Sequence, residues 1–366
     1  MNLLSPKVYG LRLVAIVFVF FATDGSAQLN VSGLKSAGSK QDFSFILLPD
    51  LQNYSKFSRN QPILDIMMNW IVASKDSLNT QLVLCTGDLV EHDDIINPDG
   101  KKMDQTGRQQ WQYVAGAFGK LDGKLPYVVA TGNHDYNIFS YTHSPKRTHF
   151  ASYFLAEKNP LNLSLLREVT ANVHQEPSIE NAVYEWVSPS GSPFLVMSIE
   201  FAPREEVLQW ASKLLAQPKY ANHTVVLLTH SFLNHKNERI LTEKYDLPGA
   251  NYGQAIWEKL VVGSKNIRLV LSGHIGAKDD ARKHVAYRVD KNAGGKAVHQ
   301  MTFNAQSMGG GHYGNGGDGW LRILSFSADG KRVAVKTFSP LFDISPSTKA
   351  MSRRREAYDE FEFAFD

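Results

Sequence analysis

Short runs of apolar and β-branched residues alternate with segments of helical periodicity from residue 42 to about residue 275. The short runs have the length and composition of strands that are buried on both faces of a sheet. They are Phe43 to Leu48, Gln81 to Cys85, Tyr127 to Ala130, Thr224 to Leu228 and Ile267 to Leu271. In the segments between them, apolar residues recur every three or four positions, as in amphipathic helices. These segments are Ile63 to Ser74, Gln109 to Leu121, Arg204 to Leu215 and Gln254 to Val262. The alternation predicts parallel strands joined by helices.

Two regions break this alternation and predict antiparallel strands. Residues 182–187 and 194–199 are strand-like and are joined by a segment rich in Ser, Gly and Pro, which is typical of a hairpin. Residues 321–326 and 332–338 form a second pair of this kind. In the tail, residues 342–366, three phenylalanines alternate with other residues and fit an edge strand. The predicted fold class is therefore α/β, a mixed β-sandwich flanked by helices, in a single domain that spans residues 42–366.

The N-terminus has the pattern of an export signal. Lys7 and Arg12 precede the apolar run 13–22, and small residues follow at positions 25–27. The run has about ten apolar residues, whereas a membrane-spanning helix needs about 20, so no retained membrane span is expected. We expect a signal peptide over residues 1–27, a linker over residues 28–41, and a mature protein that is periplasmic or extracellular.

Composition narrows the range of partners. The formal net charge of +3 is small and the basic residues are scattered, so neither nucleic acid nor an anionic membrane is expected as the main partner. Cys85 is the single cysteine, so no disulfide forms within the chain. Its apolar surroundings in the sequence favour a small buried hydrophobic residue over a nucleophile or metal ligand. The sequence leaves the oligomeric state open.

Polar side chains of the kinds that bind metal ions follow each of the five apolar runs. The carboxyl ends of parallel strands meet at one edge of a sheet, so we expect these side chains to lie close together. Carboxylate and amide oxygens and imidazole nitrogens suit hard or borderline divalent cations. The residues are Asp50 and Gln52; Asp88; Asn133, His134 and Asp135; His230; and His274. The sequence therefore predicts a divalent-metal site at the strand ends.

These clusters resemble the signature of the calcineurin-like metallophosphoesterase superfamily, which runs D-x-H, G-D, G-N-H-D/E, H and G-H-x-H. The resemblance covers residues 42 to about 340. Residues 48–54, 298–300 and 316–322 are most similar to an exported bacterial-type branch. The resemblance implies a mixed sandwich covered by helices and metal-dependent hydrolysis of phosphoesters.

The resemblance also implies a role for each cluster. Asp88 would bridge two metal ions, and Asp50 would belong to one of them. The other ion would be completed by Asn133, His230 and His274. His134 would lie beside the bound phosphate and assist departure of the leaving group, and Asp135 would orient His134. A carboxylate that is hydrogen-bonded to one imidazole nitrogen fixes the tautomer and favours the protonated form.

Two positions depart from the signature. The histidine of D-x-H is Gln52, and the second histidine of G-H-x-H is Gly276. Both changes fall on the same metal position, which keeps Asp50, Asp88 and the Gln52 amide oxygen. This all-oxygen set favours Mg²⁺, Mn²⁺ or Ca²⁺ over zinc there. We expect one or two divalent cations and leave Mn, Mg, Fe, Zn and Ca open. His284 and His299 are candidates to replace the missing imidazole and Gln306 is a candidate to reach the pocket, but for each an ordinary surface or strand polar role is favoured.

The predicted reaction is direct attack of a metal-activated water on the phosphorus of a small-molecule phosphomonoester or phosphodiester. Two cations would lie about 3.5 to 4 Å apart. The alternative is a catalytically degenerate metal- or phosphate-binding module. A purple acid phosphatase is disfavoured because Glu91 stands where that class has a tyrosine. Residues 136–180 are expected to form a lid-like insertion. The candidates for substrate contacts are His143, Arg147, His149 and Tyr153, and the alternative for them is a solvated loop.

Overall fold

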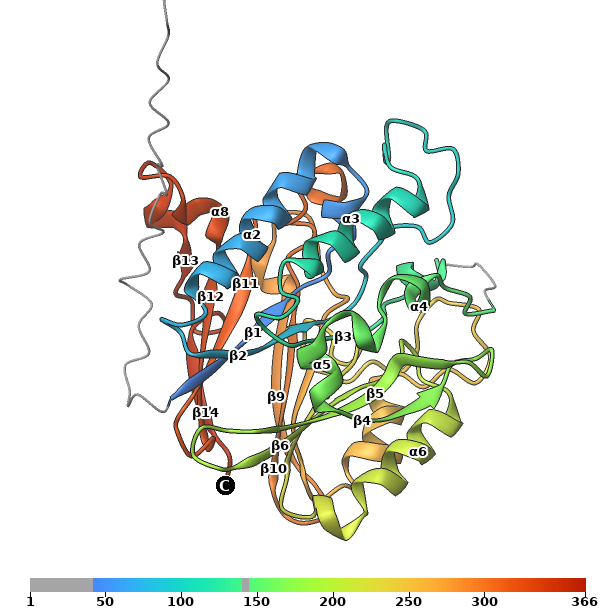
Figure 1. Ribbon diagram of the computed structural model, residues 1–366, viewed down its shortest axis with the longest axis vertical. Coiled ribbons are helices and arrows are strands. Elements are labelled where there is room, and N and C mark those ends of the chain that lie inside the picture. The colour runs from blue at the N-terminus through green and yellow to red at the C-terminus, as the bar shows by residue number, and fades with distance from the viewer. Residues whose placement is uncertain (1–41, 140–144) are drawn as a thin grey trace, which may run out of the picture.

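The computed structural model describes residues 42–139 and 145–366, which form two facing β-sheets with helices on the outer faces (Figure 1). The predicted signal peptide and linker lie outside the described residues, as does His143. Within the part of the chain that is described, no helix combines the length and apolar character needed to cross a membrane. The architecture confirms the predicted mixed sandwich in a single domain.

The first sheet has seven strands, with three parallel strands at one side. Its order is β13-β12-β11-β1-β2-β3, and β14 also pairs with β12. The parallel strands are β1 (Phe43–Leu48), β2 (Thr80–Cys85) and β3 (Tyr127–Val129). The antiparallel strands are β11 (Leu321–Phe326), β12 (Arg332–Phe338), β13 (Arg353–Arg354) and β14 (Phe361–Ala364). The predicted hairpin and the edge strand of the tail are both present.

The second sheet also has seven strands, in the order β4-β5-β6-β7-β8-β10-β9. Strands β6 (Pro193–Ser198), β7 (Thr224–Leu228), β8 (Ile267–Ser272) and β10 (Ala297–Phe303) run parallel. Strands β4 (Leu166–Ala171), β5 (Pro177–Val187) and β9 (Val285–Lys291) are antiparallel to their neighbours. Strand β4 lies within residues 136–180, so the later part of the segment expected to be a lid belongs instead to this sheet.

Alternate side chains of the central strands point to opposite faces of the sheet and contribute to two separate hydrophobic cores. In β1, Phe43, Phe45 and Leu47 face the second sheet, whereas Ile46 and Leu48 face the covering helices. All six residues of β1 are buried. A strand that is apolar on both faces must be covered on both faces, which explains the continuous apolar run in the sequence.

Helices cover the outer face of each sheet (Figure 1). On the first sheet these are α2 (Gln61–Ser74) and α3 (Gly107–Gly119), and on the second α6 (Glu205–Leu215) and α7 (Gly253–Ile256), which continues as a π-helix over Trp257–Val261. Shorter helices are α1 (Gln52–Ser55), α4 (Phe150–Tyr153), α5 (Pro160–Leu165) and α8 (Pro340–Asp343). Helix α3 begins with a capping box between Thr106 and Gln109.

Candidate metal centre

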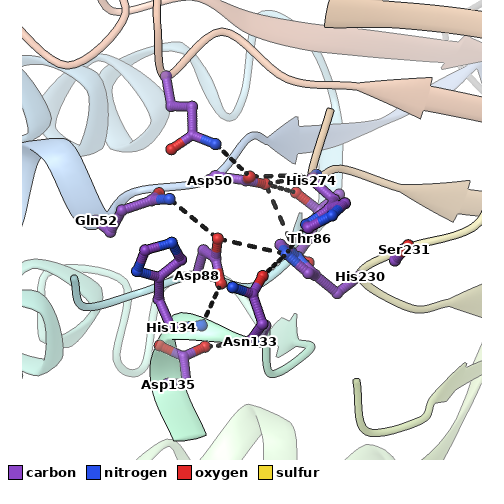
Figure 2. Close-up of polar contacts among 12 residues, drawn as sticks. Asp50, Gln52, Thr86, Asp88, Asn133, His134, Asp135, His230, Ser231 and His274 are labelled. Carbon is purple, nitrogen blue, oxygen red and sulfur yellow. Dashed lines mark hydrogen bonds and ion pairs between the residues drawn. The ribbon is translucent and has the colours of Figure 1, made fainter. Parts of the chain in front are cut away.

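Asp88 lies at the centre of the polar cluster that follows the parallel strands (Figure 2). It comes just after β2 in a left-handed backbone conformation, with φ of 49°. The turn after β3 passes so close that a Cβ at Gly132 would lie 2.1 Å from Asp88 Oδ1. The His134 backbone N–H donates to the same oxygen over 3.0 Å. Asp88 Oδ1 is therefore held by a backbone donor, and Oδ2 faces His230 and Gln52.

His230 follows β7 and presents one nitrogen to this cluster. Its Nδ1 lies 2.8 Å from the carbonyl oxygen of Thr86. A carbonyl only accepts hydrogen bonds, so Nδ1 carries the hydrogen and Nε2 holds the lone pair of the neutral ring. Nε2 lies 3.4 Å from Asp88 Oδ2 and 3.2 Å from Asn133 Oδ1.

His274 follows β8, and its contacts fix the other tautomer, with the hydrogen on Nε2. Its Nε2 lies 3.2 Å from Oε2 of Glu243, which is an acceptor when ionised. The pKa of Glu243 is lowered, because His274 outweighs the effect of burial. Nδ1 is then the lone-pair nitrogen, and it lies 3.1 Å from His230 Nε2. A carboxylate behind a metal-binding imidazole commonly sets the tautomer in this way.

Four acceptor atoms therefore converge on one point. Asn133 Nδ2 donates to the carbonyl of Ile138 over 2.9 Å, which turns Oδ1 toward His230. Asp88, His230 and His274 form a group whose ligand atoms all lie within 4.8 Å of one another. Ligands at about 2.0 to 2.2 Å from an ion lie about 3 to 3.5 Å apart, which the separations of 3.1 to 3.4 Å from His230 Nε2 match. The donor set fits a divalent cation.

The carboxylates of the cluster favour a positive charge at its centre. Burial acts against the charged form of His230, but Asp88 and Asp50 outweigh it and raise its pKa to about 10. Burial also acts to raise the pKa of Asp88, which nevertheless lies well below its usual range because His230 and His134 are near. The carboxylates of this pocket therefore favour a positive charge beside them, which a bound divalent cation would supply.

Gln52, in α1, lies on the other side of Asp88 from His230, whereas Asp50, after β1, lies on the histidine side, with its Oδ1 4.0 Å from His230 Nδ1 (Figure 2). The Asp50 carboxylate is buried, and burial raises its pKa to about 6 despite the opposing effect of His230. The Gln52 amide Nε2 donates to Asp88 Oδ2 over 3.0 Å. Gln52 Oε1 is buried and has no hydrogen-bond partner among the described residues. The structure thus brings both predicted residues to the centre, but the Gln52 group that faces Asp88 is a donor.

His134 lies at the edge of the cluster, in a short 3-10 turn after β3. Its Nδ1 is 2.9 Å from the carbonyl oxygen of Glu91 and 3.8 Å from Glu91 Oε2. Nδ1 therefore carries the hydrogen, and Nε2 is the atom that can act on a substrate. Burial opposes protonation of His134, but the Glu91 and Asp88 carboxylates outweigh it, so its pKa is raised.

The expected role of Asp135 is wrong in its geometry. The carboxylate of Asp135 accepts hydrogen bonds from the backbone N–H groups of Leu89, Val90 and Gly132, at 2.8, 3.1 and 2.8 Å. It ties the turn after β2 to the turn after β3. The 3-10 turn directs the two neighbouring side chains apart (Figure 2), and the carboxylate nearest to the His134 ring is that of Glu91.

Glu91 is itself held by Lys56 and His312, two contacts that the sequence did not indicate. Lys56 Nζ lies 3.3 Å from Glu91 Oε2, and His312 Nε2 lies 3.0 Å from Oε1. Burial lowers the pKa of Lys56 to about 8, although Glu91 acts to raise it. His312 belongs to the glycine-rich segment that follows β10, so this contact places that segment beside His134.

The three candidates for the second metal position lie in different places in the structure. Gln306 reaches the centre, where its Nε2 donates to Asp50 Oδ2 over 3.2 Å. His299 lies on β10, bonded to Tyr287 and to the carbonyl of Ala364, so both of its nitrogens are used elsewhere. His284 Nδ1 faces the carbonyl of Asp280 at 2.9 Å, and its Nε2 is buried beside Gly276.

Of the expected lid residues that the structure describes, none lines the cavity of about 890 Å³ beside the metal ligands. His149 Nδ1 lies 2.8 Å from Asp93 Oδ2, and the Tyr153 ring stacks on Trp111. These four side chains line a separate cavity of about 420 Å³. Arg147 is exposed.

Three comparisons place the chain among known proteins. Residues 43–277 match the family of calcineurin-like phosphoesterases. The chain is 25% identical over 312 residues to a Bacillus subtilis (strain 168) protein named uncharacterized protein YvnB. That match covers 82% of this chain but 20% of YvnB, so the chain spans about a fifth of that protein's length. Among solved structures, GAP50, titled the anchor in the inner membrane complex of Plasmodium, is similar with a TM-score of 0.42 and 10% identity over 86% of this chain and 88% of that one.

Proposed function

Because the chain belongs to the calcineurin-like phosphoesterase family, we propose that it hydrolyses a phosphoester at the centre around Asp88. The observation that carries this proposal is the convergence of four acceptor atoms, from Asp88, Asn133, His230 and His274, at separations that fit one cation. A divalent cation held there supplies a Lewis acid for the phosphoryl oxygens and lowers the pKa of a bound water.

His134 is the residue we assign to proton transfer. Its Nδ1 hydrogen is held by the Glu91 carbonyl, and its raised pKa favours a second proton on Nε2. An imidazolium beside the substrate can donate that proton to the leaving-group oxygen as the phosphorus–oxygen bond breaks. Asp135 supports this arrangement from behind by fixing the turn on which His134 lies.

We place the substituent of the phosphoester in the cavity that adjoins the metal ligands. This cavity has a volume of about 890 Å³, and His274 and Glu243 are part of its wall. Its other walls carry both acidic and basic side chains, including Glu238, Lys283 and Arg288. A mixed polar lining of this size suits a polar small molecule.

A comparison of one ligand variant with a matched control tests the function. Nitrophenyl monoester and diester substrates, with added Mn²⁺, should be hydrolysed by the wild type but not by Asp88→Asn. The control is Asp76→Asn, because the Asp76 side chain is 88% exposed and lies outside the centre. Equal background rates for all three proteins would contradict hydrolysis and favour the alternative, a metal- or phosphate-binding module.

We also propose that the protein is exported. Lys7, Arg12 and the apolar run 13–22 support this, as does the small-residue exit at positions 25–27. N-terminal sequencing of the protein recovered from outside the cytoplasm should give Gln28 as the first residue. An intact Met1 on all of the recovered protein would contradict cleavage of the signal.

A further inference from the structure

The Asp50 carboxylate, which the family signature assigns to a second metal ion, is surrounded by protein hydrogen-bond donors. Thr86 Oγ1 donates to Oδ1 over 3.1 Å, and the His274 backbone N–H is shared between the two oxygens at 3.3 and 3.2 Å. Two amides, Asn304 Nδ2 and Gln306 Nε2, donate to Oδ2 over 2.7 and 3.2 Å. An ionised carboxylate has about four lone-pair sites, so four donors saturate it.

The amide of Asn304 cannot turn its oxygen toward a cation without losing other bonds. Its Oδ1 accepts hydrogen bonds from the backbone N–H groups of Ala305 and Gln306, at 2.7 and 3.1 Å. This pair of bonds fixes the NH₂ group toward Asp50. Asn304 follows β10, so the donor is delivered by the end of a strand, as the metal ligands are.

Two further acceptors at the second position, Gln52 Oε1 and His284 Nε2, are buried with no hydrogen-bond partner among the described residues, but the contacts of each argue against a shared ion. Gln52 presents its NH₂ group to Asp88 Oδ2, the oxygen that a second ion would share. At Gly276 there is no imidazole, and a Cβ there would lie 2.6 Å from His284 Nε2. His284 therefore occupies the space that a side chain at position 276 would need.

We propose that this chain holds one divalent cation, at Asp88, Asn133, His230 and His274, and that protein amides replace the second one. The inference rests on the proposed function, which requires a metal ion but not two. Asp50 is then a positioning residue: it binds the His274 backbone, whose φ is 73°, and so aims the His274 ring at the cation.

Titration with Mn²⁺ alone tests the number of ions. Metal analysis after removal of free Mn²⁺ should give one ion per chain, and frozen-solution electron paramagnetic resonance should give the six-line spectrum of an isolated Mn²⁺. Two ions per chain with an exchange-coupled spectrum would overturn the inference and leave the proposed function standing. Binding of no ion would overturn both.

Three variants separate the two positions. His274→Ala should lose the bound Mn²⁺. Gln52→Met, which keeps the side-chain volume without an amide, should still bind one ion with an unchanged spectrum. Asp50→Asn should bind one ion about 10- to 100-fold more weakly, as expected for a residue that acts through a ligand. Thermal unfolding shows whether each variant is folded. If Asp50→Asn does not fold, the number of ions bound by the wild type and by Gln52→Met decides the test. Two ions in the wild type and one ion in Gln52→Met would overturn the inference.

Discussion

At the scale of single residues, the side chains of the centre divide into those whose acceptor atoms converge and His134, to which we assign proton transfer. Each imidazole is locked by a partner behind it: Thr86 for His230, Glu243 for His274, and the Glu91 carbonyl for His134. The first two locks leave nitrogens that converge, whereas the third leaves Nε2 of a ring that is not in the group of converging ligands. The difference separates metal binding from proton transfer.

Replacement of His134 should therefore affect turnover without affecting metal binding. In His134→Ala we expect kcat to fall about 10²- to 10⁴-fold, the usual contribution of a positioned acid. Mn²⁺ content should match that of the wild type, because the His134 ring is not among the converging ligands. Steady-state kinetics and metal analysis on the same preparation check both. Unchanged turnover, or loss of the metal, would contradict the assigned role.

At the scale of elements, the site is built by turns whose backbones approach one another closely. Gly132, between β3 and the His134 turn, has no room for a side chain. Gly273, after β8, is similar, because its Cβ would lie 2.3 Å from Asp50 Oδ1. The parallel strands of both sheets therefore end against one another with glycine at the points of contact.

A methyl group at Gly132 should disturb this contact. Its Cβ would lie 2.1 Å from Asp88 Oδ1, so Gly132→Ala should lower the free energy of unfolding by about 1 to 3 kcal/mol and weaken Mn²⁺ binding. Gly116→Ala on α3 is the matched control, because nothing lies within 4 Å of its Cβ. Urea unfolding and Mn²⁺ titration measure the two effects. Equal results for the two variants would contradict the steric account.

An ion-pair cluster fixes the start of α6 to the end of β6. Glu200 is buried, and its carboxylate lies 3.0 Å from Lys146 Nζ and 3.0 Å from Arg204 Nε. Burial acts to raise the pKa of Glu200, but Lys146 and Arg204 outweigh it and lower the pKa to about 2. The stabilisation should therefore be complete above the ordinary value of 4.5 and decline as the pH falls toward 2.

Substitution of Glu200 should show this pH dependence. At pH 7, Glu200→Gln should lower the free energy of unfolding by about 3 to 5 kcal/mol, as is usual when one partner of a buried pair is removed. The gap between wild type and variant should narrow at about pH 3, because the wild-type carboxylate then binds a proton. Glu205→Gln, which removes an exposed pair with Lys259, should have little effect at either pH. A gap that stays constant with pH would contradict the assignment.

At the scale of the whole molecule, the two sheets meet in an aromatic core that the C-terminal strand closes. Phe363 and Phe365 are buried in this core, and the Phe363 ring stacks on His299 with centroids 4.3 Å apart. Arg268 of β8 pairs with Asp366. The last residues of the chain thus join the first sheet, through β14, to the second.

Truncation of Phe363 should destabilise the whole sandwich. Phe363→Ala should lower the free energy of unfolding by about 3 kcal/mol, the lower end for a buried phenylalanine, because the site lies near the sheet edge. Glu362→Ala is the control, since its side chain is exposed on the opposite face of β14. Denaturant unfolding of both checks the difference. A loss in Phe363→Ala no larger than in the control would contradict a role in the core.

The sequence predicted the strands and the ligands that follow them because both depend on local order. Asp50, Asp88, Asn133, His230 and His274 each stand directly after a buried strand, so their convergence follows from the parallel sheets. Asn304 follows the end of β10, so the same rule could have predicted its place in the centre.

Other features depend on tertiary contacts that no local pattern carries. Glu243 lies in the long segment between β7 and α7, where its position is set by contact with His274. Asp135 is adjacent to His134 in sequence, yet the 3-10 turn separates the two side chains and Glu91 takes the place beside the ring. The supposed lid contains a strand because Leu166–Ala171 finds a pairing partner in β5.

The most direct test of the metal centre is an anomalous difference map from crystals grown with Mn²⁺. We predict one peak per chain, surrounded by Asp88 Oδ2, Asn133 Oδ1, His230 Nε2 and His274 Nδ1, the atoms that converge in the structure. Absence of a peak at this position in fully Mn²⁺-soaked crystals would contradict the account.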